Sequence, residues 1–328
     1  MPSQPDADTA ETLEAIGEVA TLARIFPRLP LAASQLLGPG DDAAVIAAPD
    51  GRYVVTTDMM IHGPDFRLAW STPHDLGWKA AASNLADVAA MGAVPTALVV
   101  AIAAPADSPV SLLEGIADGL RDACETLAPG CGVVGGDLSV SATLTIAVTA
   151  FGDLEGRAPV LRSGARAGDV VAVAGVLGEA AASLRLLFAA AMDVNGEPDA
   201  RLAGALRART AAQLAPTPPI AAGRLAAIAG ATAMLDLSDG LAIDAGRMAA
   251  ASSVGIEFES DALGSDPAMA MAGGEDHSLL AAFSPGAELP DGFRRIGICV
   301  DGAGLTVDGA PHDSAGWDPY RDWAGSGG

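Results

Sequence analysis

The sequence is almost devoid of lysine: of its 18 Lys and Arg residues, only Lys79 is a lysine. Against 41 Asp and Glu residues, this gives a formal net charge of −23. Nucleic-acid binding depends on Lys and Arg neutralising backbone phosphates, so the charge balance argues against a nucleic-acid partner. A phosphate-rich small molecule would need divalent cations to approach so acidic a protein.

Cysteines and long apolar runs are scarce as well. The three cysteines, Cys124, Cys131 and Cys299, have no zinc-type spacing, which favours a reduced, intracellular setting. The beginning of the chain lacks the pattern of a secretory signal, and the most apolar run, residues 94–106, is shorter than the roughly 20 residues that span a bilayer. We therefore expect a cytoplasmic protein with no membrane partner.

With 328 residues, half of them hydrophobic, the chain is long enough for two globular domains. Runs with helical and with strand periodicity alternate throughout, which predicts an α/β (α+β) architecture. A shift to Gly, Arg and Pro around residues 152–168 suggests the junction. We expect domains over residues 10–152 and 153–320, with a disordered tail at 1–9 and a flexible one at 321–328.

One predicted helix, residues 73–91, carries an unusual polar line. Thr72 can cap it, Pro73 suits its first position and Gly92 can close it. Lys79, Ser83 and Asp87 follow one another at intervals of four residues on an otherwise Ala-rich helix. The line either faces a functional site or is a solvated stripe, and the sequence leaves both open.

Acidic residues recur beside glycines or at the predicted ends of apolar strands. The first two motifs fall on a predicted hairpin, with strands at residues 43–47 and 53–57 around the turn Pro49-Asp50-Gly51. Each motif alone is more typical of an ordinary turn or cap than of a metal site. Together they favour a Mg²⁺–phosphate site, because carboxylates and hydroxyls are the ligands that Mg²⁺ prefers. The motifs are Gly40-Asp41-Asp42, Thr56-Thr57-Asp58, Gly135-Gly136-Asp137, Asp236 to Gly240 and Gly273-Gly274-Glu275-Asp276.

In order and spacing these motifs, together with Gly77-Trp78-Lys79-Ala80, Asn84 and Asp87, resemble those of the thiamine-monophosphate kinase family. The resemblance extends from about Gly38 to Trp317. It implies an aminoimidazole ribonucleotide synthetase-like fold whose N-terminal sheet forms a barrel in a homodimer. It also implies ATP-dependent phosphorylation of thiamine monophosphate to thiamine diphosphate, assisted by several Mg²⁺ ions.

The resemblance implies roles for individual residues, carried over motif by motif. It implies metal ligation by Asp42, Thr56, Thr57, Asp58, Asp87, Asp137, Asp236 and Asp239. It implies ATP contacts from Ala117, Gly136, Asp137, Arg162 and Ser238, and contacts on the thiamine side from Asp65, Glu275 and Trp317. From the residues alone, other readings stay open: Arg162 as a surface arginine, Ser238 as a helix cap and Trp317 as a packing anchor.

Two positions depart from the family pattern. Asp65 stands where the family commonly has a histidine, and Ala117 stands where it often has a tyrosine beside adenine. Asp65 would repel a substrate phosphate, and Ala117 leaves the adenine contact to its neighbours. Two alternatives therefore stay open: another ATP-dependent enzyme of the superfamily, such as an aminoimidazole ribonucleotide synthetase, or a nucleotide- and metal-binding relative without catalysis.

Overall fold

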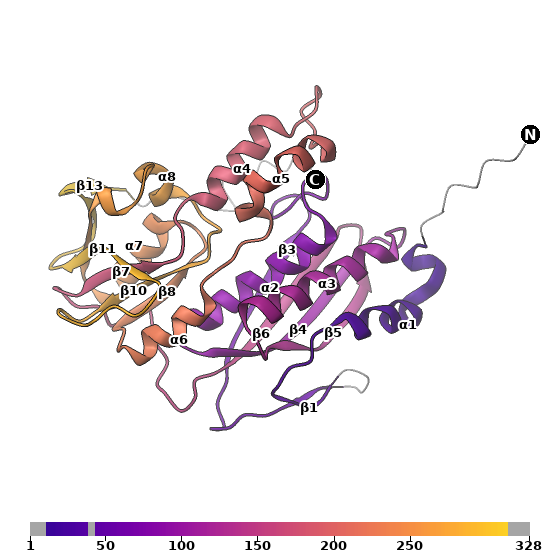
Figure 1. The fold of residues 1–328 in the computed structure, drawn as a ribbon, viewed down its shortest axis with the longest axis horizontal. Helices are drawn as coiled ribbons and strands as arrows, with labels where there is room; N and C mark the ends of the chain where they lie inside the picture. Colours follow the sequence, from indigo (N-terminus) through magenta and orange to yellow (C-terminus); the bar gives the residue numbers. More distant parts are fainter. Residues whose placement is uncertain (1–10, 39–42, 314–328) are drawn as a thin grey trace, which may run out of the picture.

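The computed structural model describes residues 11–38 and 43–313. The predictions for both terminal tails, for Asp42 and for Trp317 lie outside the described residues. Within them the chain forms two halves, each built on its own sheet, that lie side by side (Figure 1).

The first half is a four-stranded sheet with two long helices on one face (Figure 1). The helices α2 (Pro73–Ala90) and α3 (Val110–Leu127) pack very closely at Gly77. A Cβ atom there would lie only 2.0 Å from the Ile116 carbonyl oxygen. In this sheet only β4 and β5 are parallel, and the strand order is β3 (Val54–Ile61), β6 (Thr145–Asp153), β4 (Val94–Ala104) and β5 (Gly132–Val140).

The opposite face of this sheet is apolar and open. On β3, Val55 and Met59 point to it, and they are 61% and 58% exposed. The ribbon of β1 (Gln35–Leu37) and β2 (Val45–Ile46) covers only a small cluster that includes Ala97 and Val134. α1 (Leu13–Ile25) and the 3-10 helix η1 (Phe26–Arg28) pack beside α3 instead.

The second half is a seven-stranded sheet with helices packed around it (Figure 1). Its strand order is β13 (Ala310–His312), β12 (Gly304–Val307), β9 (Gly255–Phe258), β11 (Phe293–Val300), β7 (Val170–Ala174), β10 (Ser278–Phe283) and β8 (Ala233–Leu237). α7 (Leu241–Ser252) leaves β8 and buries Leu241 and Met248 in the core of this half. The remaining helices are α4 (Glu179–Ala190), α5 (Ala200–Leu214), α6 (Ile220–Ile228), α8 (Pro267–Ala272) and the 3-10 helix η2 (Ser260–Ala262).

α2 is the element that joins the two halves. It contacts α5, α6, β8 and β10 of the second half as well as its own sheet. The loop that precedes it is attached to α4, because Trp70 Nε1 donates a hydrogen bond to the Ala191 carbonyl and the Arg67 guanidinium lies 4.7 Å from both the Trp70 and Phe188 rings. α2 is therefore held on every side.

Two local predictions are wrong. The turn at Pro49-Asp50-Gly51 forms, but the strands around it do not make a hairpin: β2 pairs with β1, and β3 pairs with β6. Asp58 and Asp137 lie inside strands and not at their ends. The long pairing with β6 extends β3 to Ile61, and pairing with β4 extends β5 to Val140.

Candidate active site

The polar line of α2 runs along the boundary between the two halves. The helix begins as predicted, with a capping box in which Thr72 and Asp75 exchange hydrogen bonds and Pro73 follows at the first position. Lys79, Ser83 and Asp87 each contact a different group on a neighbouring element. At 1.5 Å per residue the line is about 12 Å long, so it connects three points of one extended site. The line is not a solvated stripe.

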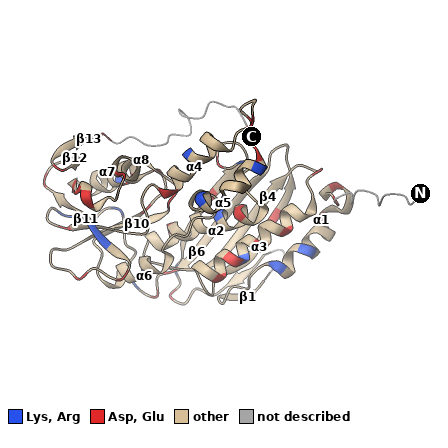
Figure 2. Cartoon of the chain, turned by 45° about the horizontal axis from the view of Figure 1, so that its top comes forward, with Lys and Arg blue, Asp and Glu red and all other residues tan. Residues whose placement is uncertain are grey.

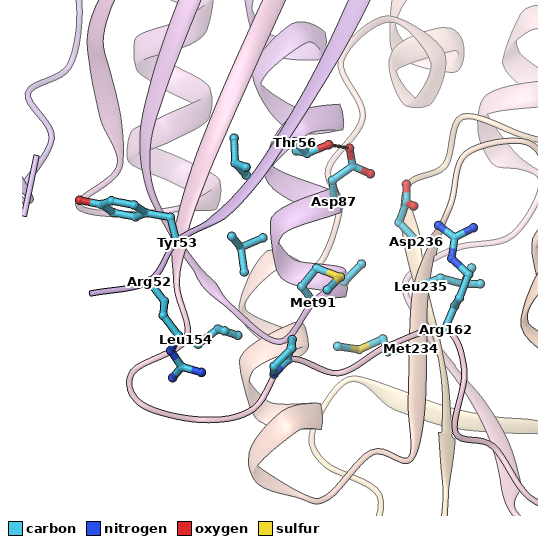
Figure 3. A pocket seen from close by; sticks show the side chains of 14 residues that line it. Arg52, Tyr53, Thr56, Asp87, Met91, Leu154, Arg162, Met234, Leu235 and Asp236 are labelled. Carbon is cyan, nitrogen blue, oxygen red and sulfur yellow. Dashed lines mark hydrogen bonds between the residues drawn. The ribbon is translucent and has the colours of Figure 1, made fainter. Parts of the chain in front are cut away.

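At one end of the line, carboxylates from both halves converge. Thr56 Oγ1 donates to Asp87 Oδ2 at 2.9 Å, and Asp236 faces them from β8 (Figure 3). Burial, followed by the charges of Asp236 and Asp58, raises the pKa of Asp87 to about 7. Burial and the charges of Asp236 and Asp239 likewise raise the pKa of Asp58, against the opposing effect of His277. The four carboxylates form an electrostatically unfavourable cluster that a cation would relieve.

A cavity of about 800 Å³ opens beside this cluster. Thr56, Asp87, Arg162 and Asp236 line its polar side, and Val54, Leu154 and Met234 are among its apolar walls. In the described part of the chain the Arg162 guanidinium forms no ion pair, whereas Arg24 and Arg121 pair with carboxylates on α3. In Figure 2 the blue segments of α1 and α3 accordingly lie close to red ones. Arg162 is therefore available to an anionic ligand in the cavity.

In the middle of the line, Ser83 Oγ lies 3.1 Å from His277 Nε2, whose ring also contacts Asp236. The next residue, Asn84, accepts a hydrogen bond from the Asp58 backbone N–H at 3.1 Å. These contacts connect α2 to β3 on one side and to the segment before β10 on the other. The positions of Asp58 and Asp236 thus depend on the same helix.

At the far end of the line, Lys79 Nζ donates to Glu275 Oε1 at 2.9 Å, and Gln213 Nε2 of α5 donates to the other oxygen. Burial acts to raise the pKa of Glu275, but the Lys79 charge and these hydrogen bonds lower it overall. Lys79 is 5% exposed, and the Glu275 side chain is 36% exposed. Glu275 is thus held as an open, ionised carboxylate.

Asp65 lies between this end and the carboxylate cluster. Its Oδ2 accepts a hydrogen bond from the Ile61 backbone N–H at 2.6 Å. Burial raises its pKa, and the charges of Glu275 and Asp58 add to the effect while Lys79 opposes it. The Asp65 side chain therefore stabilises the loop after β3 through its hydrogen bond to Ile61, in addition to its place near the site.

The second half holds Asp239 and Ser238 in the turn after β8. Arg247 Nη1 donates to Asp239 Oδ2 at 2.6 Å and to Asp244 Oδ1 at 2.7 Å. Burial, opposed by the Asp239 backbone N–H, raises the pKa of Asp244 to about 6. Ser238 does not cap α7, whose N-cap is Gly240, so the alternative reading of Ser238 as a helix cap is wrong. Its carbonyl instead accepts the Glu275 backbone N–H.

Asp137, Gly136 and Ala117 are not at this cluster. They line a small apolar cavity of about 110 Å³ beneath α1 and η1, together with Leu22 and Phe26. β6 and β4 separate β5 from β3, which corresponds to about 14 Å across the sheet. Packing within the sheet explains why residue 136 is a glycine, because a Cβ atom there would lie 1.9 Å from the Val100 carbonyl oxygen.

Thr57 also faces away from the cluster. Its hydroxyl donates to the Val148 carbonyl at 2.9 Å and accepts from Thr149 on the open face of the sheet. Thr56 and Asp58 alternate with it and face α2. Within one chain, then, the site gathers Thr56, Asp58, Asp87, Arg162, Asp236 and Asp239 near the cavity and Asp65 and Glu275 beyond it.

Three residues of this arrangement were not predicted: His277, Gln213 and Asp244. His277 lies two residues after Glu275, at the end of a predicted acidic motif, and that position was the only available signal. Gln213 and Asp244 sit on ordinary helical sequence, so nothing local distinguishes them.

The donor set suits Mg²⁺ bound together with a phosphate ligand. Among residues 11–38 and 43–313, no group of three His, Cys, Asp or Glu side chains is placed to hold a metal ion by itself. Mg²⁺ commonly keeps several waters and takes one or two carboxylates plus substrate phosphates, so a complete protein cage is not required. Burial and neighbouring carboxylates raise the pKa values of Asp58 and Asp87, and Asp236 faces Asp87 from β8, so these three carboxylates fit that mode.

Comparison with known proteins places this site in a family. The model of the AIR synthase related protein N-terminal domain matches residues 40–154, and that of the C-terminal domain matches residues 166–289. The fold and site therefore define a member of the AIR synthase related proteins.

Individual proteins similar to this chain fall within one family of the AIR synthase related proteins. A thiamine-monophosphate kinase of Mycobacterium tuberculosis is 43% identical over 97% of this chain and 94% of that protein. The crystal structure of thiamine-monophosphate kinase from Stenotrophomonas maltophilia has a TM-score of 0.73 at 31% identity, covering 90% of this chain and 96% of that one. The structure of AaThiL complexed with AMPPCP and TMP has a TM-score of 0.72 at 34% identity, covering 84% and 90%. The chain belongs to the thiamine-monophosphate kinase family.

Among the described helices, none has the length and apolar character needed to cross a membrane.

Proposed function

We propose that this chain transfers the γ-phosphoryl group of ATP to thiamine monophosphate, giving thiamine diphosphate and ADP. The observation that carries the proposal is the polar line of α2. At one end of this line Asp87 belongs to the carboxylate cluster beside the large cavity, and at the other end Lys79 holds the Glu275 carboxylate. The AaThiL relative complexed with AMPPCP and TMP supports the same pair of ligands.

Different residues of the chain would bind the two anionic ligands, ATP and thiamine monophosphate. Asp58, Asp87, Asp236 and Asp239 would hold Mg²⁺, with Thr56 beside them and Asp42 from outside the described residues. When bound, Mg²⁺ neutralises phosphate charge. Arg162 lines the nucleotide side and would meet phosphate oxygens directly, and Ser238, two residues after Asp236, would contact the nucleotide from the turn after β8.

The acceptor occupies the space between the carboxylate cluster and Glu275. Glu275, ionised by its contact with Lys79, suits the polar edge of a cationic heterocycle, and Trp317 would stack on it from outside the described residues. A phosphate monoester has a second pKa near 6, so its oxygen is already largely ionised at neutral pH. No general base is needed, and the acceptor oxygen attacks the γ-phosphorus in line once both ligands are held in position.

We further propose that the functional unit is a homodimer closed through the open sheet. β3 and β5 are the two edges of the four-stranded sheet, and the open face carries exposed Val55 and Met59. Pairing the β3 edge of one copy with the β5 edge of another would remove both free edges in a closed barrel. The same pairing would place β5, which carries Asp137, beside β3, which carries Thr57, across the subunit boundary.

The decisive experiment incubates the purified chain with Mg²⁺, ATP and thiamine monophosphate and follows thiamine diphosphate by mass spectrometry. Formation of thiamine diphosphate with stoichiometric ADP is expected. Thiamine without its phosphate is the matched control, because it lacks the attacking oxygen and should give no product. ATP binding with no product from thiamine monophosphate would contradict the proposal and favour a non-catalytic relative.

A further inference from the structure

His277 lies between the two halves with both ring nitrogens engaged. Nδ1 is 3.3 Å from Asp236 Oδ2 on β8, and Nε2 is 3.1 Å from Ser83 Oγ on α2. Ser83 Oγ is in turn fixed by donating to the Lys79 carbonyl at 3.0 Å. The His277 side chain is 8% exposed, so these contacts are shielded from water.

The backbone around His277 is held in a costly conformation. His277 and Glu275 both have positive φ angles, 51° and 64°, which cost non-glycine residues roughly 1 kcal/mol or more each. Their backbone N–H groups donate to the Leu237 and Ser238 carbonyls at the end of β8. Asp276, between them, accepts backbone hydrogen bonds from Gly178 and Ala180 at the start of α4. Strain that the surroundings enforce in this way is concentrated at functional sites.

This backbone sends alternate side chains in opposite directions. Glu275 and His277 point to α2, whereas Asp276 points to α4. The His277 ring consequently contacts the Asp236 carboxylate from the side of α2, the same helix that carries Asp87. An apolar side chain of similar size would fill the space but would leave Asp236 free to rotate.

We propose that His277 is a positioning residue that fixes the Asp236 carboxylate opposite Asp87 and Asp58 for divalent-cation binding. The proposal rests on the proposed function only for the identity of the reaction, because the cation affinity can be measured without any substrate. Hydrogen-bonded partners of metal-binding groups of this kind typically contribute 10- to 100-fold in affinity.

The test measures Mn²⁺ binding by electron paramagnetic resonance in the intact chain, without nucleotide or acceptor. His277→Phe should weaken Mn²⁺ binding about 10- to 100-fold, while His277→Asn, whose amide nitrogen takes the place of Nδ1 and can still donate to Asp236, should recover most of the loss. His277→Leu, which has no hydrogen-bond donor, should resemble the phenylalanine variant, and it serves if that variant does not fold. His74→Phe, at the hydrogen bond between α2 and Asp122 of α3, is the matched control and should leave Mn²⁺ affinity unchanged.

Kinetics separates positioning from a general structural effect. In the His277 variants the Mg²⁺ concentration for half-maximal rate should rise, while the KM for thiamine monophosphate at saturating Mg²⁺ stays near that of the unsubstituted chain. Unchanged Mn²⁺ affinity in His277→Leu, an asparagine variant no better than leucine, or no Mn²⁺ binding by the unsubstituted chain would each overturn the proposal. A chain that binds Mn²⁺ in this His277-dependent way but makes no thiamine diphosphate would refute only the proposed function.

Discussion

Lys79 and Glu275 are 196 residues apart in sequence, yet their Nζ and Oε1 atoms lie 2.9 Å apart across the boundary between the two halves. Lys79 comes from α2 and Glu275 from the segment before β10. Gln213 of α5 completes the contact on the other carboxylate oxygen. The Lys79–Glu275 pair thus fixes a carboxylate on the acceptor side of the proposed site.

Lys79→Met should raise the KM for thiamine monophosphate at least 10-fold while leaving the KM for ATP nearly unchanged, because Glu275 loses the charge that lowers its pKa. The loss of stability should be modest, about 1 kcal/mol, since the Glu275 side chain is 36% exposed. Steady-state kinetics and thermal melts measure the two effects. Lys79→Arg is the conservative control, and the double variant with Glu275→Gln should be less than additive. An unchanged acceptor KM in Lys79→Met would count against this role.

Asp58→Asn should lower kcat by about 100-fold or more, because the amide cannot replace a carboxylate in neutralising phosphate charge through a cation. The fold should persist, since the hydrogen bond of this position to Asn84 is made by its backbone N–H. Circular dichroism checks the fold and the product assay checks turnover. Asp107→Asn, on an exposed loop, is the matched control. Turnover close to that of the unsubstituted chain would rule out Asp58 as a ligand.

The stability of the metal-free chain should fall as pH rises from about 4 to 7. The folded-state pKa of Asp87 is about 7, above the ordinary value of about 3.9, so within this window the folded state binds more protons than the unfolded state. Its free energy of unfolding must then decrease with pH. Asp87→Asn should reduce this slope and be the more stable protein at pH 8 in EDTA, although inactive. Melting temperatures across the range test it, and a variant less stable than the parent at pH 8 would contradict it.

Gly77→Ala should destabilise the chain by roughly 1–3 kcal/mol, because the new Cβ atom would lie 2.0 Å from the Ile116 carbonyl and force α2 away from α3. Turnover should fall as well, since the polar line moves with the helix. Gly204→Ala on α5 meets no atom within 4 Å and should stabilise the chain by about 0.5–1 kcal/mol. Urea unfolding distinguishes the two substitutions. Equal effects would mean that the contact between α2 and α3 adapts freely.

Val55→Glu should convert the proposed homodimer to a folded monomer. Val55 is 61% exposed on the open face of the sheet, so the charge costs little in a monomer but would be buried in a dimer. Light scattering after size exclusion gives the mass of each variant. Val194→Glu, at a position fully exposed in the loop between α4 and α5, is the matched control. A dimer that survives Val55→Glu would place the subunit contact elsewhere.

Local sequence signals predicted α2 well because its determinants are local. Thr72, Pro73 and Gly92 fix its ends, and four-residue spacing places Lys79, Ser83 and Asp87 on one face. The strand ends were harder to predict, because β3 and β5 continue as far as their neighbours pair with them. The predicted hairpin failed for the same reason: turn chemistry at Asp50 and Gly51 specifies the reversal but not the partner strand.

The site itself was predicted only in part. The acidic motifs singled out Asp58 and Asp236, and the polar line of α2 singled out Asp87, all three of which the structure brings together. They could not show that Asp137 lies at the far edge of the sheet, which depends on the strand order. Nor could they identify Gln213 or His277, whose importance comes from contacts with residues 62 and 41 positions away, Glu275 and Asp236.

The scarcity of lysine has a practical consequence for observing this protein at work. Lys79 carries the only side-chain amine in the sequence, and it is 5% exposed against Glu275. Amine-directed acylating reagents should therefore modify little besides the α-amino group while the two halves are closed. Labelling of Lys79, read as a single mass increment on one peptide, would report every opening of the boundary. The chain thus contains an intrinsic, single-site probe for any separation of its two halves.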